Sequence, residues 1–270
     1  MGIANRVDTE NLCWEKRFSE KNQIPTVNSQ LFTRIDDFYV VKRFEEIGHL
    51  PEYIQIGGKI YKRFLEIFYL EKKLAELSIS SVLKICDIRL KNLKSVASLD
   101  YNKYIICELI KKSIEPAINN DSSEKKILDF GIGSGISLDC LKQVDNDNLF
   151  ELVGTDISHD ALRESAGKGI DTFYWRNGKH VHPESFDAIF SSFVFDFHIT
   201  FNEIKRLHSL LKKDRRMVLN MYKNDNENFE NIKRKLSRAG FRIKDKELKI
   251  AKDRFGIKHN KEKIIIAEKM

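Results

Sequence analysis

Two apolar segments that each end at an acidic residue constrain the fold of this chain more than any other feature. The first, residues 126–130, carries Asp129 and runs straight into a turn that contains Gly131, Gly133 and Gly135. The second ends at Asp156, twenty-one residues after Gly135. A glycine turn lets the backbone approach a ligand closely, and an acid about twenty residues later can bind ribose hydroxyls. The pattern predicts a nucleoside-cofactor site at the ends of two neighbouring strands.

From about residue 120 onward, short apolar runs alternate with amphipathic segments. Strands are expected at 126–130, 151–156, 171–175, 187–192, 216–222, 241–248 and 262–268, with helices at 101–114, 135–143, 159–166, 201–212 and 227–239. Strands that are too apolar to have a solvent-exposed face indicate a mostly parallel sheet covered by helices on both faces. We therefore expect an α/β, doubly wound, mostly parallel seven-stranded sheet. Since no convincing helix separates the last two strands, an antiparallel strand is expected at its edge.

Residues 1–98 lack this alternation and are predicted to form a helical N-terminal extension. Between Ile60 and Leu77, apolar residues recur at steps of three and four, which is typical of an amphipathic helix. A shorter helix is expected over 38–47, whereas 77–90 fits either helix or strand. The extension is expected to be a substrate lid or a dimerisation region that would make the protein a homodimer, and residues 99–270 the cofactor-binding domain.

Composition narrows the classes of partner. No apolar run approaches the roughly 20 residues of a membrane span, and the first residues lack a secretory signal, so a cytoplasmic protein without a membrane partner is expected. The net charge of +7 raises the question of nucleic acid. Lysines stand beside acids almost everywhere, as in 244–247, which disfavours a nucleic-acid partner without excluding it. The four cysteines are too scattered for a zinc pattern, and no metal site is predicted.

The spacing of the glycines distinguishes between nucleoside cofactors. A dinucleotide fingerprint would need its third glycine at position 136, where this chain has Ile136, and the phosphate-binding Gly-Lys-Ser/Thr loop is absent. An acid just ahead of the glycines suits a ligand with a positive amino-acid end. The segments ILDFGIGSG, VGTDIS and FDAIFSSFVFDF resemble the successive motifs of the class I, Rossmann-like, S-adenosylmethionine-dependent methyltransferases. The resemblance covers roughly residues 100–270.

This resemblance implies a set of cofactor contacts. The methionine end of S-adenosylmethionine would be held by Asp129, Gly131, Gly133 and Gly135, the ribose by Asp156, and the adenine by Ile157. Further contacts are expected from Ser192 and Phe193 after the fourth strand, from Arg176 and Asn177 after the third, and from Tyr104 ahead of the first. Arg176 and Asn177 depart from the acid and small residue that the family often has there.

Asp196 and His198, in the loop after the fourth strand, are the candidates for a general base toward the methyl acceptor. After the fourth strand the chain has neither the Asn/Asp-Pro-Pro-aromatic sequence nor the cysteine that would resemble base-methylating enzymes, and it lacks the paired glutamates of arginine methylation. A small-molecule O, N or C acceptor is therefore the preferred expectation. Two alternatives stay open: an RNA or protein methyltransferase, and a repurposed S-adenosylmethionine-binding protein without net methyl transfer.

Overall fold

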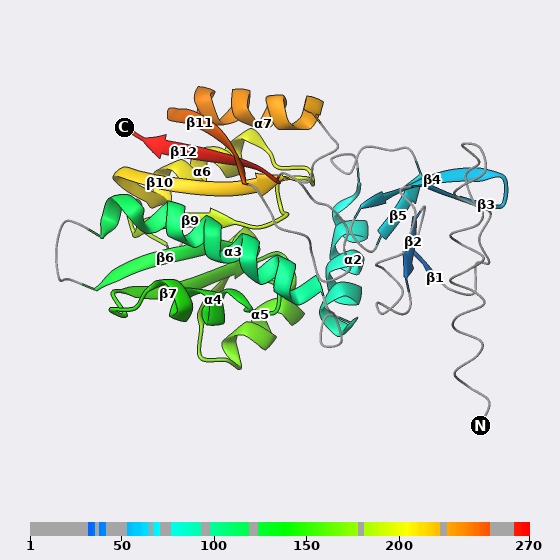
Figure 1. The fold of residues 1–270 in the computed structure, drawn as a ribbon, viewed down its shortest axis with the longest axis horizontal. Coiled ribbons are helices and arrows are strands. Elements are labelled where there is room, and N and C mark those ends of the chain that lie inside the picture. Colours follow the sequence, from blue (N-terminus) through cyan, green and yellow to red (C-terminus); the bar gives the residue numbers. More distant parts are fainter. Residues whose placement is uncertain are drawn as a thin grey trace.

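The fold contains two sheets, one small and one large. The computed structural model describes residues 32–35, 38–41, 53–64, 67–70, 77–92, 98–118, 124–177, 181–221, 226–248 and 262–270. Within them the five-stranded sheet has the order β1-β2-β5-β4-β3, and the seven-stranded sheet has the order β11-β12-β10-β9-β6-β7-β8 (Figure 1).

The large sheet has the predicted strands. They are β6 (Lys125–Phe130), β7 (Phe150–Asp156), β8 (Asp171–Tyr174), β9 (Phe186–Ser191), β10 (Leu211–Met221), β11 (Phe241–Leu248) and β12 (Glu262–Lys269). Strands β8, β7, β6, β9 and β10 pair in parallel, and β12 pairs antiparallel with both β10 and β11. The expectation of a mostly parallel seven-stranded sheet is confirmed.

The antiparallel strand lies one place further in than predicted, because β12 sits between β10 and β11. Ile264, Ile265 and Ile266 of β12 are buried, so side chains on both of its faces are covered. Arg242 and Lys244 of β11 are exposed. A strand that is apolar on both faces belongs inside a sheet, and charged side chains suit an edge strand.

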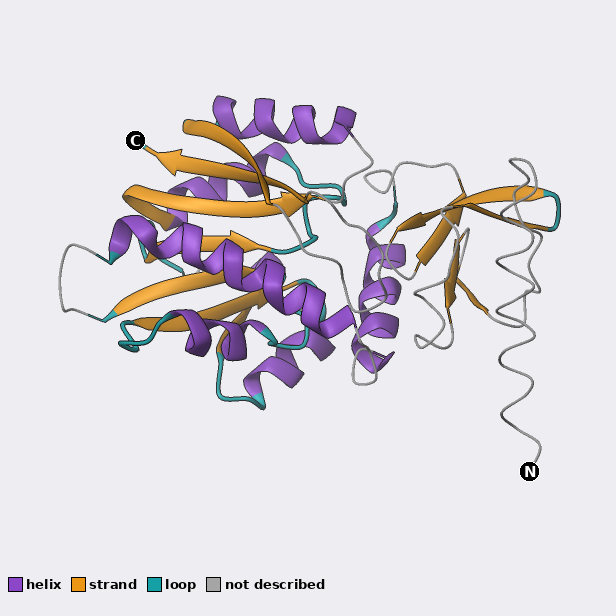
Figure 2. Ribbon diagram, in the orientation of Figure 1, coloured by secondary structure: helices purple, strands orange, loops and turns teal. Residues whose placement is uncertain are grey.

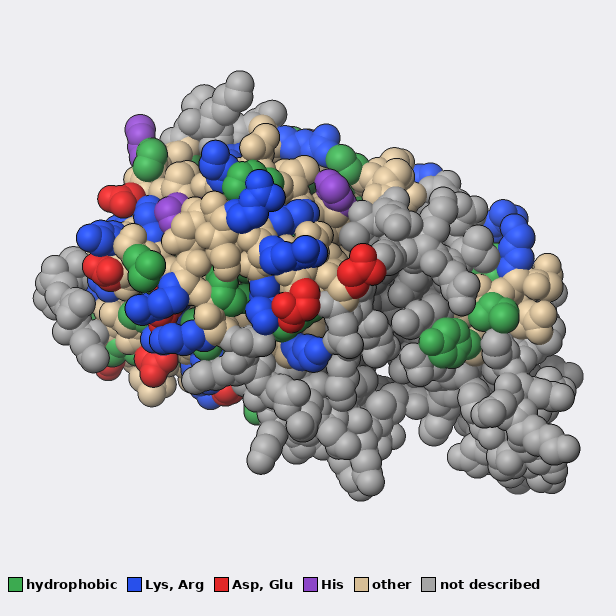
Figure 3. Space-filling view, turned by 90° about the horizontal axis from the view of Figure 1, so that it is seen from above, with side chains coloured by type: hydrophobic (Ala, Val, Ile, Leu, Met, Phe, Trp, Pro, Cys, Tyr) green, Lys and Arg blue, Asp and Glu red, His purple; other side chains and the backbone are tan. Residues whose placement is uncertain are grey.

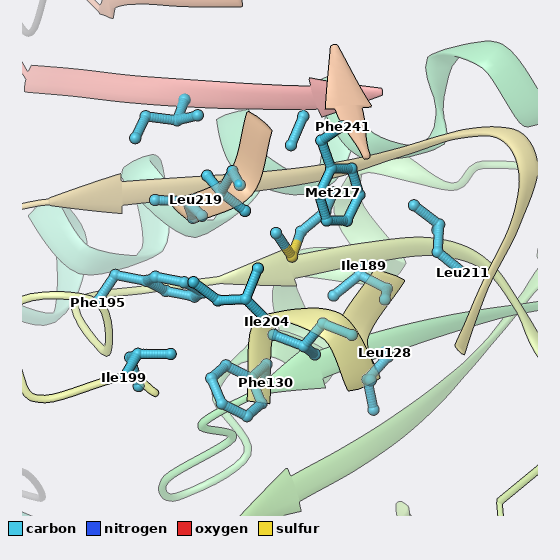
Figure 4. Packing of buried hydrophobic residues seen from close by; sticks show 14 of the residues in the cluster. Leu128, Phe130, Ile189, Phe195, Ile199, Ile204, Leu211, Met217, Leu219 and Phe241 are labelled. Atoms are coloured by element: carbon cyan, nitrogen blue, oxygen red, sulfur yellow. The ribbon is translucent and has the colours of Figure 1, made fainter. Parts of the chain in front are cut away.

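Helices cover both faces of the large sheet (Figure 2). They are α3 (Ser98–Ile114), α4 (Ser137–Val144), α5 (His159–Ala166), α6 (Phe201–Leu210) and α7 (Asn226–Arg238), with short turns η5 (Glu115–Ala117) and η6 (Trp175–Asn177). Successive strand residues face opposite sides. Ile127 therefore joins the apolar cluster beneath α3, α4 and α5, whereas Leu128 joins the cluster beneath α6 and α7, part of which is seen in Figure 4. The expected boundary after residue 98 falls at the first residue of α3.

The prediction of a helical N-terminal extension was wrong for the described residues between 32 and 70, which form strands, whereas residues 79–92 are helical. Segments expected to be helical at 38–47 and 60–77 contain strands of an antiparallel sheet instead. The strands are β1 (Phe32–Ile35), β2 (Phe38–Val41), β3 (Tyr53–Ile56), β4 (Lys59–Phe64) and β5 (Ile67–Leu70).

Turn chemistry explains why this region folds as strands. Gly57 and Gly58 have φ of 56° and 77° and join β3 to β4 as a two-residue hairpin turn, which requires positive φ at both positions. Ile54 and Tyr61 pair across that hairpin and are both buried. Aromatic and β-branched side chains favour such half-buried strands over a helix.

Helix α2 (Ile79–Asn92) occupies the segment for which helix and strand were both open. Ser78 starts it by accepting a hydrogen bond from the Ser81 backbone N–H at 3.1 Å. The helix packs against α5 and β1, and it lies between the two sheets, where the parallel strands of the large sheet point toward it (Figure 1). None of the described helices combines the length and the apolar character that crossing a membrane requires.

Candidate functional site

A cavity of about 390 Å³ lies at the carboxyl ends of the parallel strands, where open sheets of this kind bind ligands. Loops after β6, β7, β8 and β9 form most of its wall, and α2 closes one side. The lining residues are Leu77, Ile79, Val82 and Cys86 from α2 and the residues just before it; Phe130, Gly131, Gly133 and Ser134 around the first turn; Asp156, Ile157 and Ala161; Trp175 and Arg176; and Ser192, Phe193, Val194, Phe197, His198, Ile199, Thr200 and Glu203.

The structure brings most of the residues predicted from the sequence to this cavity. Those that line it are Gly131, Gly133, Asp156, Ile157, Arg176, Ser192, Phe193 and His198. Asp129, Gly135, Asp196 and Tyr104 are not among the lining residues. Asn177 belongs to η6, but its side chain lies outside the described residues.

The glycine turn after β6 is shaped for close approach by a ligand. Gly131 has φ of 92°, and a Cβ there would overlap the Val194 side chain. Gly133 has φ of 54° and nothing within 4 Å of the position that a Cβ would take. The turn therefore leaves open space in front of Gly133, which only a residue without a side chain preserves.

Hydrogen bonds fix this turn to β7. The Gly131 and Ile132 N–H groups both donate to the Thr155 carbonyl, at 2.8 and 3.1 Å. On the other side of the turn, the Ser165 hydroxyl donates to the Gly133 carbonyl at 2.9 Å. The turn is held from two sides, so its geometry is set by the fold before any ligand binds.

Asp156 is the acid that organises the site. One carboxylate oxygen accepts the Gly133 N–H at 3.0 Å and the other accepts the Ser158 N–H at 2.9 Å. Burial raises the pKa of Asp156, and the backbone donors, Gly133 and Ser158 among them, oppose that rise by stabilising the ionised form. Each carboxylate oxygen can accept more than one hydrogen bond, so the two oxygens can also accept hydroxyl protons from a ligand.

Asp129 lies beneath the turn instead of in the cavity wall. Asp129 is only 3% exposed, and it lies in β6, which pairs with β7 on one side and β9 on the other. Burial raises its pKa to about 7, and the neighbouring Asp156 adds to the rise. Near neutral pH Asp129 is thus poised between its charged and neutral forms. Gly135 also lies away from the cavity, packed against Ile170 and Ser165.

The loop after β9 forms another part of the cavity wall, and its Val194 lies against Gly131 of the glycine turn. Ser191 ends the strand, and its hydroxyl donates to the Phe130 carbonyl at 2.8 Å. Phe193 has φ of 60°, a conformation that costs a non-glycine residue roughly 1–3 kcal/mol. Its N–H donates to the side-chain oxygen of the fully buried Asn220 at 2.9 Å, which supports this conformation. Asn220, on β10, was not predicted as a site residue.

The two candidate bases lie in different environments. His198 lines the cavity and its side chain is exposed, so it can reach both the cavity and solvent. Asp196 is buried and does not line the cavity. Its carbonyl lies 3.5 Å from the side-chain amide of Asn228 in α7. The geometry favours His198 for any proton transfer in the cavity.

Trp175 and Glu203 belong to the wall and were missed by the sequence analysis. The Trp175 indole N–H donates to a Glu203 oxygen at 3.1 Å, and its ring packs edge-on against Phe130 at 4.8 Å. The Arg206 guanidinium lies over the same ring system, 4.1 Å from the centroid. Trp175 directly follows β8, so its position at the end of a strand is the feature of the sequence that could have identified it as a site residue.

Tyr104 was predicted as a cofactor contact, and the structure places it elsewhere. Helix α3 turns Ile105 and Leu109 onto the sheet, which leaves Tyr104 outward and 43% exposed. There it lines a separate surface depression with Lys103, Cys107 and other residues of α3 and α4. The apolar residues of α2 take part in the wall instead, which no motif in the sequence indicated.

Comparisons with known proteins agree with this fold. No protein-family model matches the sequence, and no curated protein matches it significantly. Among solved structures, the CurJ carbon methyltransferase is 14% identical with a TM-score of 0.50, over 77% of this chain and 75% of that one.

Two further solved structures are similar at lower scores. The DszA carbon methyltransferase is 13% identical, with a TM-score of 0.46 over 79% of this chain and 76% of its own. A SAM-dependent methyltransferase from Archaeoglobus fulgidus is 20% identical, with a TM-score of 0.43 over 60% of this chain and 94% of its own. The seven-stranded sheet and its flanking helices have the class I methyltransferase fold, as the sequence motifs predicted.

Proposed function

We propose that the protein binds S-adenosylmethionine in the strand-end cavity and transfers its methyl group to a small-molecule acceptor. One observation carries the proposal: the open glycine turn and the Asp156 carboxylate border the same cavity and are hydrogen-bonded to each other. The fold alone does not establish activity, because one fold supports many functions.

The residues present fit such a cofactor. The space in front of Gly133 admits a ligand against bare backbone, and Asp156 offers carboxylate oxygens to ribose hydroxyls. Ile157 supplies an apolar surface beside that acid for the adenine ring. Asp129, held under the turn, would favour a ligand with a positively charged amino group, since a nearby cation stabilises the carboxylate form.

When bound, the cofactor would supply a methyl group that its sulfonium already activates for displacement. The protein then has to hold an acceptor in line with that methyl group, exclude water, and receive a proton if the acceptor carries one. His198, which lines the cavity, is the residue proposed to receive it. Apolar side chains from α2 and the β9 loop, such as Val82, Val194 and Phe197, would exclude water.

The acceptor is proposed to be a small molecule because of the cavity and the distribution of charge. A cavity of about 390 Å³ falls within the range of small-molecule sites. Figure 3 shows Lys and Arg side chains spread over one face, with Asp and Glu among them in the part described. Several cations of the described residues form ion pairs, as Arg216, Arg242 and Lys244 do with Glu268. Paired and dispersed cations favour a solvated surface over a phosphate-binding stripe.

Methyl-labelled S-adenosylmethionine incubated with the protein and a metabolite extract tests this proposal. Label in the low-molecular-weight fraction, formed about 100-fold more slowly when His198→Ala replaces the wild type, is the expected result. Label in RNA or protein would instead favour the macromolecular alternative. Binding of the cofactor without any labelled product would favour the repurposed cofactor-binding protein.

A further inference from the structure

A chain of hydrogen bonds connects α2 to the acid at the end of β7. The Ser158 hydroxyl donates to an Asp87 oxygen at 3.0 Å, and Asp87 lies on α2. The Ser158 N–H donates to Asp156, and the Gly133 N–H donates to the other oxygen of the same carboxylate. Three segments far apart in the sequence thus meet in one hydrogen-bonded array around the candidate ribose acid.

The Ser158 hydroxyl has a fixed position in this array. It is buried, and it caps α5 by accepting the Ala161 N–H at 3.2 Å. The Ser158 oxygen accepts the hydrogen bond of the cap, and the single hydroxyl proton is donated to Asp87. This hydrogen bond runs from the N-terminus of α5 to α2. It is stronger than a hydrogen bond between neutral groups because its acceptor is a carboxylate.

Asp87 stands next to the part of α2 that walls the cavity. Ile79, Val82 and Cys86 line it at steps of three and four residues, so they share one helix face. Asp87 follows Cys86 directly and faces α5 through Ser158. Burial is the main cause that raises the pKa of Asp156, and the charge of Asp87 contributes to the same rise. The charge of Asp87 therefore acts on the Asp156 carboxylate.

We propose that Asp87 is a positioning residue that couples the docking of α2 to nucleoside binding at Asp156. The inference rests on the proposed function, because it takes the ribose of the cofactor as the ligand of that acid. With the Asp87–Ser158 hydrogen bond formed, α2 closes the cavity while Ser158 and Gly133 hold the Asp156 carboxylate in place. A ligand that binds this arrangement stabilises the closed position of α2, and a closed α2 strengthens binding of the ligand by the same factor.

Two substitutions at Asp87 separate this role from general stability. Asp87→Ala removes the acceptor and is expected to weaken binding of S-adenosylhomocysteine about 10-fold, the size typical of one charged hydrogen bond. Asp87→Asn keeps an oxygen for the Ser158 proton and is expected to bind within about 2-fold of the wild type. In turnover the Ala variant should raise the KM for the cofactor and leave kcat unchanged.

Amide hydrogen exchange tests docking without any ligand. Asp87→Ala should exchange faster across Ile79–Asn92 than the wild type, and Asp87→Asn should not. Asp160→Ala is the matched control, since this acid lies in the first turn of α5 and its ion pair is local, with Arg163. It should change neither exchange in α2 nor ligand binding.

The Ser158→Ala variant completes the test. Because it already lacks the donor, adding Asp87→Ala to it should weaken binding no further. Equal binding and equal exchange in Asp87→Ala and the wild type would overturn the inference, and so would an additive double variant. A wild type that binds no S-adenosylhomocysteine would refute the proposed function and the ligand coupling with it, whereas the exchange experiment still decides whether Asp87 docks α2.

Discussion

Replacing Gly133 by alanine tests whether the glycine turn is a ligand-binding surface or only a connection. Gly133 has φ of 54°, a conformation that costs an alanine roughly 1–2 kcal/mol. No described protein atom lies within 4 Å of the added Cβ, so no steric term adds to that cost. For a domain of this size we expect a decrease in melting temperature of about 2–8 °C.

The effect on ligand binding should be larger than the effect on stability. The added methyl group would occupy the space in front of the turn, where a ligand would lie against the backbone. Overfilling a well-packed contact by one methyl group costs roughly 1–3 kcal/mol. This corresponds to binding of S-adenosylhomocysteine that is weaker by about 5- to 150-fold.

Gly169→Ala is the matched control for the conformational term. Gly169 has φ of 83°, is exposed, and likewise has nothing within 4 Å of the place where a Cβ would lie, but it does not line the cavity. Thermal unfolding and calorimetric titration should show similar losses of stability in both variants and a loss of affinity in Gly133→Ala alone. Equal affinities in the two variants would refute the reasoning that a ligand lies against this turn.

Three further predictions address other parts of the site. Asp129→Asn should raise the free energy of unfolding at pH 8 by up to about 4 kcal/mol and change it little at pH 4. The folded-state pKa of about 7 lies above the unfolded-state pKa, so the wild type loses stability as the pH rises from the unfolded-state value to the folded-state value. Equal gains at both pH values in thermal unfolding would contradict this. His198→Ala should keep the wild-type melting temperature and cofactor affinity because the side chain is exposed, but lower the methylation rate about 100-fold; an unchanged rate would remove His198 from the mechanism. Trp175→Phe should destabilise the protein by about 1–3 kcal/mol because Glu203 loses its indole donor, and a denaturation midpoint equal to that of the wild type would show that the hydrogen bond contributes nothing.

The sequence predicted the large sheet well because its strands are unambiguous. Segments such as Leu152–Val153 are apolar on successive residues, and only a strand covered on both faces buries both. The N-terminal region was harder, since Tyr61, Phe64 and Phe68 fit a helical repeat as well as strands. By sequence alone the pair Gly57-Gly58 fits a break between two helices, although its conformation makes it a hairpin turn.

The candidate site was predictable where residues follow strand ends and not where distant segments meet. Asp156 and Gly133 lie at strand ends, and parallel pairing of β6 with β7 brings them together. The α2 wall is joined to the start of α5 by a hydrogen bond between Asp87 and Ser158, which are 71 positions apart. Nothing in the local pattern around Asp87 indicates that partner, because the contact is set by tertiary packing.

Calorimetric titration of the purified chain with S-adenosylhomocysteine, with NADH and ATP as comparison ligands, tests the central claim most directly. Binding of S-adenosylhomocysteine with one site per chain, abolished or strongly weakened in Gly133→Ala and not in Gly169→Ala, is the predicted result. Tight binding of NADH or ATP, with no heat from S-adenosylhomocysteine or S-adenosylmethionine, would contradict it.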